Sequence, residues 1–283
     1  MASIYDHIFK KGSLTPALVE KARIELYETK DKQTICINEL RKVILENKSC
    51  DEGQEVFEMV EKKDDDFLLR FLRARKFDVK KTYGLLKGHL KFHKNYPQLT
   101  SDLTLESVQP CLERGYPCLL PLRDKEGRTV FCFSIENWDK NEFPFLVIMR
   151  AYLYLLQKLI VNHQTQVTGC VLIENFYNYS LKQAWGLKTS ELKAMVDILQ
   201  GSFPARFQGV HVINEPWYFT WTYAMVKPFL KRKLSKKVFV HGYSLENFWD
   251  YFDQDSMPKE LGGGGPSYDS QILIDALKKL ENE

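Results

Sequence analysis

The stretch Val167-Thr168-Gly169-Cys170-Val171-Leu172-Ile173 decides the fold class, because it is a short apolar run between two helical patterns. The helical patterns cover residues 145–160 before it and residues 190–200 after it. Strands that alternate with helices at this spacing pair largely in parallel, since a parallel connection needs a long crossover. The sequence therefore predicts an α/β fold with a mostly parallel sheet.

Other apolar runs support the same sheet. They lie at residues 118–122, 130–135, 209–213 and 237–240, with a helical pattern over residues 217–236 between the last two. Most positions in these runs are apolar, as in strands that helices cover on at least one face. We expect each run to form one strand.

The first hundred residues contain helical patterns instead of strands. Thr15 and Pro16 suit the N-cap and the first turn of a helix. Further helical patterns cover residues 34–48, 67–76 and 79–95. We therefore predict an N-terminal helical domain over residues 1–98 and a sheet-containing domain over residues 99–283.

The composition indicates a globular protein of the cytoplasm. The hydrophobic content is 44% and the net charge is only +3, which argues against bulk nucleic-acid binding. The six cysteines form no Cys-x-x-Cys pair, which suits reduced thiols, and residues 1–11 are too polar for a secretory signal. Residues 143–160 are long and apolar enough to suggest a membrane span, but they contain Arg150, so we expect a buried helix there instead.

Residues 216–245 contain no Asp or Glu and divide into an aromatic half and a basic half. In a helix, Trp217, Trp221, Met225 and Phe229 would form one apolar stripe, and Pro228 would kink the helix or start a second one. An apolar segment beside a basic one suits a protein that holds a greasy molecule near an anionic surface. The alternative is an ordinary core helix followed by a solvated basic turn. The cations of the basic half are Lys227, Lys231, Arg232, Lys233, Lys236 and Lys237.

Motifs for catalysis are absent from the sequence. There is no Gly-x-Ser-x-Gly, Gly-x-Gly-x-x-Gly, Walker loop or His-Glu-x-x-His. His89 and His93 are one helical turn apart, but no carboxylate or thiol ligand accompanies them. We expect no metal, no cofactor and no enzymatic activity, although an enzyme of another type stays open.

Six short motifs occur in a distinctive order and spacing. They are DFLLRFLRARKF at 66–77, SFPARF at 202–207, PWYF at 216–219, KPFLK at 227–231, VHG at 240–242 and P-x-x-LGG at 258–263. Together they resemble the CRAL-TRIO lipid-transfer family. Within that family, Ile-Glu-Asn-Trp at 135–138 and Ile-Glu-Asn-Phe at 173–176 most resemble cellular retinaldehyde-binding protein.

The resemblance implies a ligand cavity that a mobile helical gate closes, with the gate over residues 217–230. The implied ligand is a retinoid such as 11-cis-retinal or 11-cis-retinol, bound without a covalent bond. Cys170 stands where the retinaldehyde binder would have an aromatic residue, so we expect a reshaped cavity. The positions that carry over as ligand-binding are Phe133, Trp138, Tyr152, Glu174, Met195, Val196, Phe219 and Tyr223.

Tyr152 and Glu174 are polar groups within otherwise apolar elements. A buried carboxylate is costly without a partner, so we expect the two to share a hydrogen bond. Such a pair could orient a ligand's aldehyde or hydroxyl group. It could equally be an internal structural hydrogen bond.

The resemblance also implies a phosphoinositide-binding cleft at Arg75, Arg206, Lys233 and Lys237, and hence a reversible, peripheral membrane contact. Two alternatives stay open for the arginines: the arginines of residues 70–75 could form a solvated face or internal salt bridges, and Arg206 could pair with a carboxylate of its own domain. Three alternatives stay open for function: transfer of tocopherol or another lipid, a phosphoinositide-binding trafficking adaptor, and an enzyme such as a retinoid isomerase.

Overall fold

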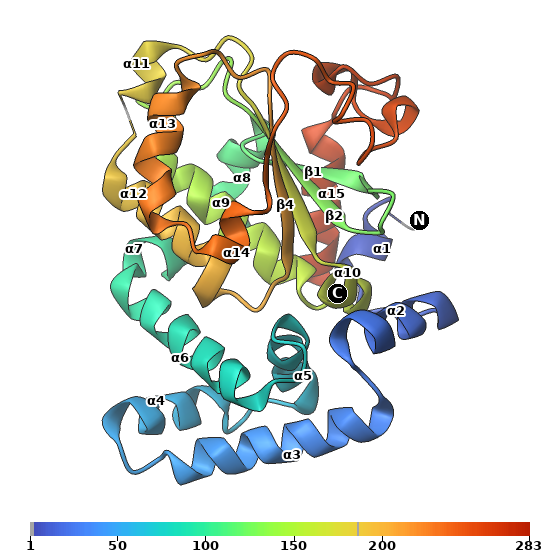
Figure 1. Cartoon of the computed structure of the whole chain (residues 1–283), viewed down its shortest axis with the longest axis vertical. Coiled ribbons are helices and arrows are strands. Elements are labelled where there is room, and N and C mark those ends of the chain that lie inside the picture. The colour runs from blue at the N-terminus through green and yellow to red at the C-terminus, as the bar shows by residue number, and fades with distance from the viewer. Residues whose placement is uncertain (1–2, 186) are drawn as a thin grey trace.

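A five-stranded sheet forms the centre of the molecule in the computed structural model, which describes residues 3–185 and 187–283 (Figure 1). The strand order is β1-β2-β3-β4-β5; β1 is antiparallel to β2 and all other neighbours are parallel. The predicted α/β class with a mostly parallel sheet is confirmed. The strands are β1 (Cys118–Arg123), β2 (Thr129–Ser134), β3 (Cys170–Asn175), β4 (Phe207–Ile213) and β5 (Val238–Val240).

The N-terminal helices pack around a core of their own beneath the sheet (Figure 1). Leu40, Leu68 and Leu72 are fully buried in this core. The side chains of Thr29 and Asp64 accept hydrogen bonds from backbone N–H groups at helix starts, as capping residues do. The helices are α2 (Pro16–Leu26), α3 (Lys30–Glu46), α4 (Asp51–Val60), α5 (Asp65–Ala74) and α6 (Val79–Asn95). The domain boundary at residue 98 stays a prediction.

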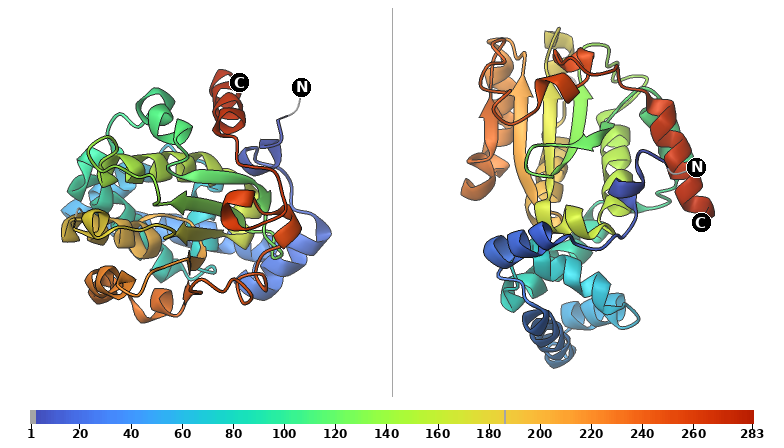
Figure 2. Two further views of the ribbon diagram at one scale, coloured as in Figure 1. Left: turned by 90° about the horizontal axis from the view of Figure 1, so that it is seen from above. Right: turned by 90° about the vertical axis from the view of Figure 1, so that its right-hand side faces the viewer.

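The two faces of the sheet have different covers (Figure 2). Helices α9 (Phe145–Leu159), α12 (Thr189–Asp197) and α13 (Phe219–Val226) pack on one face. On the other face, Phe248 and Phe252 from the C-terminal part pack against the alternate strand residues. Outside α9 lie α8 (Leu105–Glu113), α15 (Ser270–Asn282) and the short helices α1 (Asp6–Phe9) and α7 (Pro97–Thr100).

Residues 217–236 do not form one continuous helix. After α13 the chain makes a 3-10 turn (Lys227–Phe229), becomes extended at Leu230 and then forms α14 (Arg232–Ser235). Pro228 lies at the start of the 3-10 turn, where its missing N–H costs least. Pro228 thus lies in the 3-10 turn that ends the first helical segment, and the second helix begins four residues later at Arg232.

The first half of the apolar stripe at α13 points outward, whereas Met225 and Phe229 are half-buried. Trp217 is 75% exposed and Trp221 is 54% exposed, whereas Phe219 and Thr222 are buried. The alternative of an ordinary core helix is therefore wrong.

Several elements differ from the sequence-based expectation. Val167 and Thr168 end the helix α10 (His163–Thr168) and do not belong to β3. Helices α1, α4, α8 and α10 were not expected. The helix at residues 145–160 is buried in the core as expected, and within residues 3–185 and 187–283 no helix has the length and apolarity that a bilayer crossing requires.

Candidate functional site

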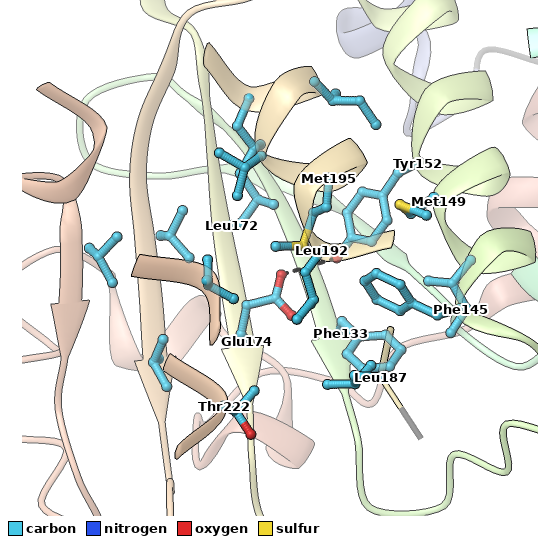
Figure 3. A pocket seen from close by; sticks show the side chains of 18 of the residues that line it. Phe133, Phe145, Met149, Tyr152, Leu172, Glu174, Leu187, Leu192, Met195 and Thr222 are labelled. Atoms are coloured by element: carbon cyan, nitrogen blue, oxygen red, sulfur yellow. Dashed lines mark hydrogen bonds between the residues drawn. The ribbon is translucent and has the colours of Figure 1, made fainter. Parts of the chain in front are cut away.

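An apolar cavity lies between the sheet and the helices α9, α12 and α13 (Figure 3). Its volume is about 170 Å³. A water molecule needs roughly 10–15 Å³ on the same measure, so the cavity accepts a much larger molecule. Nearly all of its wall consists of aliphatic and aromatic side chains, and such a wall favours a hydrophobic ligand.

The strands and α9 direct their side chains into the cavity by simple periodicity. Phe131 and Phe133 on β2, and Leu172 and Glu174 on β3, are two residues apart and therefore share one face of the sheet. On α9 the lining residues follow the three- and four-residue spacing of a helix face. All eight residues proposed from the resemblance line this cavity: Phe133, Trp138, Tyr152, Glu174, Met195, Val196, Phe219 and Tyr223. Their contact with a ligand stays a prediction.

The same periodicity could have identified lining residues that the sequence comparison missed. They include Phe131, Ile148, Met149, Leu172 and Leu192. Each lies on the same face of the same strand or helix as one of the eight proposed residues. The alternation along β2 and β3 is therefore a sufficient signal for Phe131 and Leu172, and helical spacing is a sufficient signal for the other three.

Glu174 and Tyr152 point toward one another inside the cavity (Figure 3). The Tyr152 hydroxyl donates a long hydrogen bond of 3.4 Å to Oε1 of Glu174. The surface that Glu174 leaves uncovered faces the cavity and not bulk water. Burial raises the pKa of Glu174 to about 8, although the Tyr152 hydrogen bond acts in the opposite direction. At neutral pH the carboxyl group is thus mostly protonated and able to donate a hydrogen bond to a ligand oxygen.

Cys170 is not among the residues that line this cavity. Its side chain is buried and lines a separate small void near Leu156 and Ile160. Cys170 therefore does not line the ligand cavity, and an effect of this position on the cavity's shape stays a prediction. Cys170 lies outside the cavity wall because it begins β3, two residues before the strand reaches the cavity at Leu172.

Helix α13 is attached to the body at both ends. At its start, the Tyr218 hydroxyl donates to the carbonyl of Tyr179, and the hydroxyls of Tyr179 and Thr222 lie 2.8 Å apart. Beyond its end, the Gln200 amide donates to the carbonyl of Phe229 and accepts from the N–H of Lys231. These bonds close the cavity on the side of α13. None of them was foreseen, because each joins segments far apart in the sequence.

A cluster of cations, the basic cleft, lies where the N-terminal helices meet α14. It consists of Arg75, Lys76, Arg206, Lys233 and Lys237. Burial lowers the pKa of Lys233, and repulsion from Lys76, Arg75 and Arg206 lowers it further. The structure thus brings together the four residues proposed from the resemblance and adds Lys76, which follows α5 in a left-handed backbone conformation.

The cleft residues differ in their partners. Lys237 donates to the carbonyl of Phe207 and to the amide oxygen of Gln208, and burial together with repulsion from Lys233 and Arg206 lowers its pKa to about 8. Arg206 forms an ion pair with a carboxylate, but not with one of its own domain, as the alternative expected. The partner carboxylate, Glu25, comes from the N-terminal helices.

Arg73 has a structural role. It is 2% exposed and donates hydrogen bonds to Glu28 and Gln166. It therefore joins the N-terminal helices to α10, and its burial keeps it out of reach of a ligand. The salt-bridge alternative is correct for Arg73.

The predicted lack of a metal site has no counter-indication in the described residues. Within residues 3–185 and 187–283, no three His, Cys, Asp or Glu side chains gather closely enough for a metal ion. Nδ1 of His89 donates a hydrogen bond of 2.8 Å to the carbonyl of Ser202, and burial lowers the pKa of His89 to about 4. The histidine pair thus belongs to the packing of α6.

Comparisons with known proteins agree with the geometry. The CRAL/TRIO domain model matches residues 113–263, and the CRAL/TRIO, N-terminal domain model matches residues 36–88. Clavesin-1 of Xenopus laevis is 38% identical over 264 residues, which cover 91% of this chain and 76% of that protein. Clavesin-2 of Homo sapiens is 35% identical over 261 residues, which cover 92% of this chain and 77% of that protein. The crystal structure of Sfh5 has the same fold, with a TM-score of 0.55 at 16% identity over 90% of this chain and 99% of that chain.

Proposed function

The chain belongs to the CRAL/TRIO lipid-binding family, and from this premise we propose that it carries one hydrophobic molecule in its cavity and releases it at membranes that contain phosphoinositides. The specific candidate is a retinoid, 11-cis-retinal or 11-cis-retinol, bound noncovalently. The observation that carries the proposal is an apolar cavity with one buried, mostly protonated carboxyl group.

The cavity chemistry favours a long neutral ligand with one polar end. Burying roughly 400 Å² of apolar ligand surface contributes about 10 kcal/mol before losses. Association and ordering cost several kcal/mol of this, so tight noncovalent binding is attainable. The Glu174 carboxyl and the Tyr152 hydroxyl then supply hydrogen bonds for an aldehyde, a hydroxyl or another carbonyl.

The outer face of α13 favours membrane contact. Trp217 and Trp221 are exposed, and the centroids of their rings lie 5.6 Å apart. Exposed tryptophans suit the interface between lipid and water. The exposed cations Lys227 and Lys231 follow directly and suit anionic headgroups.

Release requires the segment of α13 to move. The hydrogen bonds of Tyr218 and Gln200 keep this segment closed. Lys233 lies in α14, just beyond the part of the chain that Gln200 contacts. A phosphoinositide that binds Lys233 more tightly in the open state would therefore favour release, because a ligand shifts an equilibrium only through differential affinity.

Extraction and mass spectrometry of the molecules that co-purify with the protein test the cargo. A parallel titration with 11-cis-retinal in the dark should shift the retinal absorption band. The shift should change in Glu174→Gln, while Glu136→Gln, outside the cavity, serves as a matched control. Retinal that stays attached after borohydride treatment and denaturation would contradict noncovalent binding.

Tocopherol, or another lipid with one hydroxyl or carbonyl group, is the second candidate, because the Glu174 carboxyl suits any such oxygen. Recovery of tocopherol or a phospholipid without retinoid binding would favour it. A protein that binds phosphoinositide vesicles but recovers and accepts no cargo would instead be an adaptor. Conversion of an added retinoid into another isomer would indicate an enzyme.

A further inference from the structure

Arg206 differs from the other cations of the basic cleft because it already forms an ion pair with a carboxylate. Its Nη2 lies 2.9 Å from Oε2 of Glu25, and its side chain is only 10% exposed. In the described part of the chain, no carboxylate forms an ion pair with Arg75, Lys233 or Lys237. One acid thus reaches into a cluster of otherwise unpaired cations.

Glu25 has a fixed position because α2 and a second ion pair place it there. Ala22 and Leu26 on the same helix are buried, and Glu25 also lies 3.0 Å from Nζ of Lys21. Burial acts to raise the pKa of Glu25, but the hydrogen bonds and charges of Arg206 and Lys21 outweigh it and lower the pKa below its usual value. Glu25 is therefore ionised at neutral pH. Helix α2 lies outside the ranges that the two family models match, 36–88 and 113–263.

We propose that Glu25 competes with lipid phosphate groups for Arg206 and thereby lowers the affinity of the basic cleft for inositol headgroups with several phosphates, the anions that are strong enough to displace it. This inference rests on the proposed function of the cleft. A phosphate monoester carries more charge than a carboxylate and has three acceptor oxygens, so it is the stronger partner for a guanidinium.

A headgroup with two phosphates can satisfy Arg206 with one phosphate and Lys233 and Lys237 with the other. A lipid with one negative charge cannot displace Glu25 and neutralise the lysines together. Displaced Glu25 still has Lys21 as a partner, so the exchange leaves no carboxylate unpaired. Glu25 therefore weakens all anions at Arg206, and it excludes the weaker ones.

The test compares Glu25→Gln with wild type on two kinds of vesicle. Phosphatidylcholine vesicles contain either a phosphatidylinositol bisphosphate or, at equal total charge, phosphatidylserine. We expect Glu25→Gln to bind bisphosphate vesicles about three- to tenfold more tightly, with a smaller gain on phosphatidylserine vesicles, since one charge at a surface changes binding by roughly this factor. The bisphosphate must break the Glu25–Arg206 ion pair when it binds wild type, whereas a lipid that cannot displace Glu25 gains only its own weaker contact with Arg206. The preference for the bisphosphate should therefore rise.

The matched control is Glu20→Gln, which removes one charge from the exposed side of the same helix, where Glu20 pairs with Arg23. It should leave both affinities unchanged. If Glu25→Gln destabilises α2, Glu25→Asp replaces it in the test. This variant keeps the charge but shortens the side chain, so it should reproduce part of the effect. Thermal unfolding of each variant identifies such a loss.

Three outcomes separate the two proposals. Equal behaviour of Glu25→Gln and Glu20→Gln, while wild-type binding depends on Lys233 and Lys237, would overturn the role of Glu25 and leave the cleft in place. If the double variant Lys233→Gln, Lys237→Gln binds phosphoinositide vesicles as tightly as wild type does, both the role of Glu25 and the role of the cleft are overturned. A gain with soluble inositol bisphosphate but none on vesicles would support the competition and assign the site to a soluble phosphate.

Discussion

The cavity and the basic cleft both contain ionisable groups without a partner of opposite charge, yet the group in the cavity is mostly neutral at pH 7 and the group in the cleft is mostly charged. In the cavity, burial raises the pKa of Glu174 to about 8, so the group is mostly neutral at pH 7. In the cleft, burial and repulsion lower the pKa of Lys237 to about 8, but the group stays mostly charged at pH 7. In a site closed to water, an ionisable group becomes neutral but can still form hydrogen bonds. In a site open to water, the group stays charged and can bind an anion.

The largest expected effect concerns the stability of the cavity. Native Glu174 binds its proton up to about pH 8, while the unfolded chain releases it near its usual pKa of 4.5. The native state therefore binds more protons in this window, and stability falls as the pH rises from 4.5 to 8. The loss is on the order of 4 kcal/mol, since each pKa unit corresponds to about 1.4 kcal/mol.

Glu174→Gln should lack this part of the pH dependence and gain stability relative to wild type at pH 8. Urea unfolding of both proteins across this pH range measures it, with Glu136→Gln as a surface control. Identical slopes for wild type and Glu174→Gln would mean that Glu174 is ionised in the native cavity, and the contrast with the cleft would disappear.

The next effect concerns the cleft. Lys233→Gln with Lys237→Gln should weaken binding to phosphoinositide vesicles by about 2 kcal/mol, roughly 30-fold, because each cation near an anionic surface contributes about 1 kcal/mol. Cargo affinity should not change. Lys30→Gln with Lys42→Gln removes the same charge from exposed positions on α3. Equal losses in both double variants would reduce the cleft to a general effect of net charge.

The strands and the cavity wall were largely predictable, because a strand places every second residue on one face. Phe133 and Glu174 could be assigned to the cavity on that basis. Helix α4 was missed because its sequence is polar and buries only Val56 and Val60 among its apolar residues. The spacing of Trp217 and Trp221 indicates a common face but not whether that face is buried. Burial depends on packing partners elsewhere in the chain.

Contacts between distant segments were not predictable. Glu25 and Arg206 are 181 positions apart, and nothing in the sequence around either residue indicates that they form a pair. The Gln200 bonds to Phe229 and Lys231 cross about thirty residues in the same way. The sequence therefore identifies the cations of the cleft, while only the fold identifies the acid among them.

A third prediction separates the outer face of α13 from the cleft. Trp217→Ala should weaken vesicle binding by about 1.5 kcal/mol, if about 60 Å² of the ring enter the lipid interface at roughly 25 cal/mol per Å². This loss should persist at high salt, whereas the contribution of Lys233 and Lys237 should decrease. A Trp217 effect that disappears with salt would place this side chain in an electrostatic contact and not in lipid.

The smallest effect tests the charge of Lys237 itself. Because its pKa is lowered to about 8, Lys237 should lose its proton between pH 7 and pH 9, and the affinity of the cleft for a phosphoinositide headgroup should fall as the pH rises. The expected change is about fivefold, somewhat less than the effect of one full charge, since bound phosphate favours the protonated lysine. Lys237→Arg should bind with an almost flat pH profile, because a guanidinium stays charged throughout this range. Titration of soluble inositol bisphosphate by calorimetry measures both profiles without a membrane. If wild type and Lys237→Arg lose affinity in parallel, then Lys237 retains its proton beyond pH 9, and the cleft tolerates repulsion between its cations better than burial and charge alone allow.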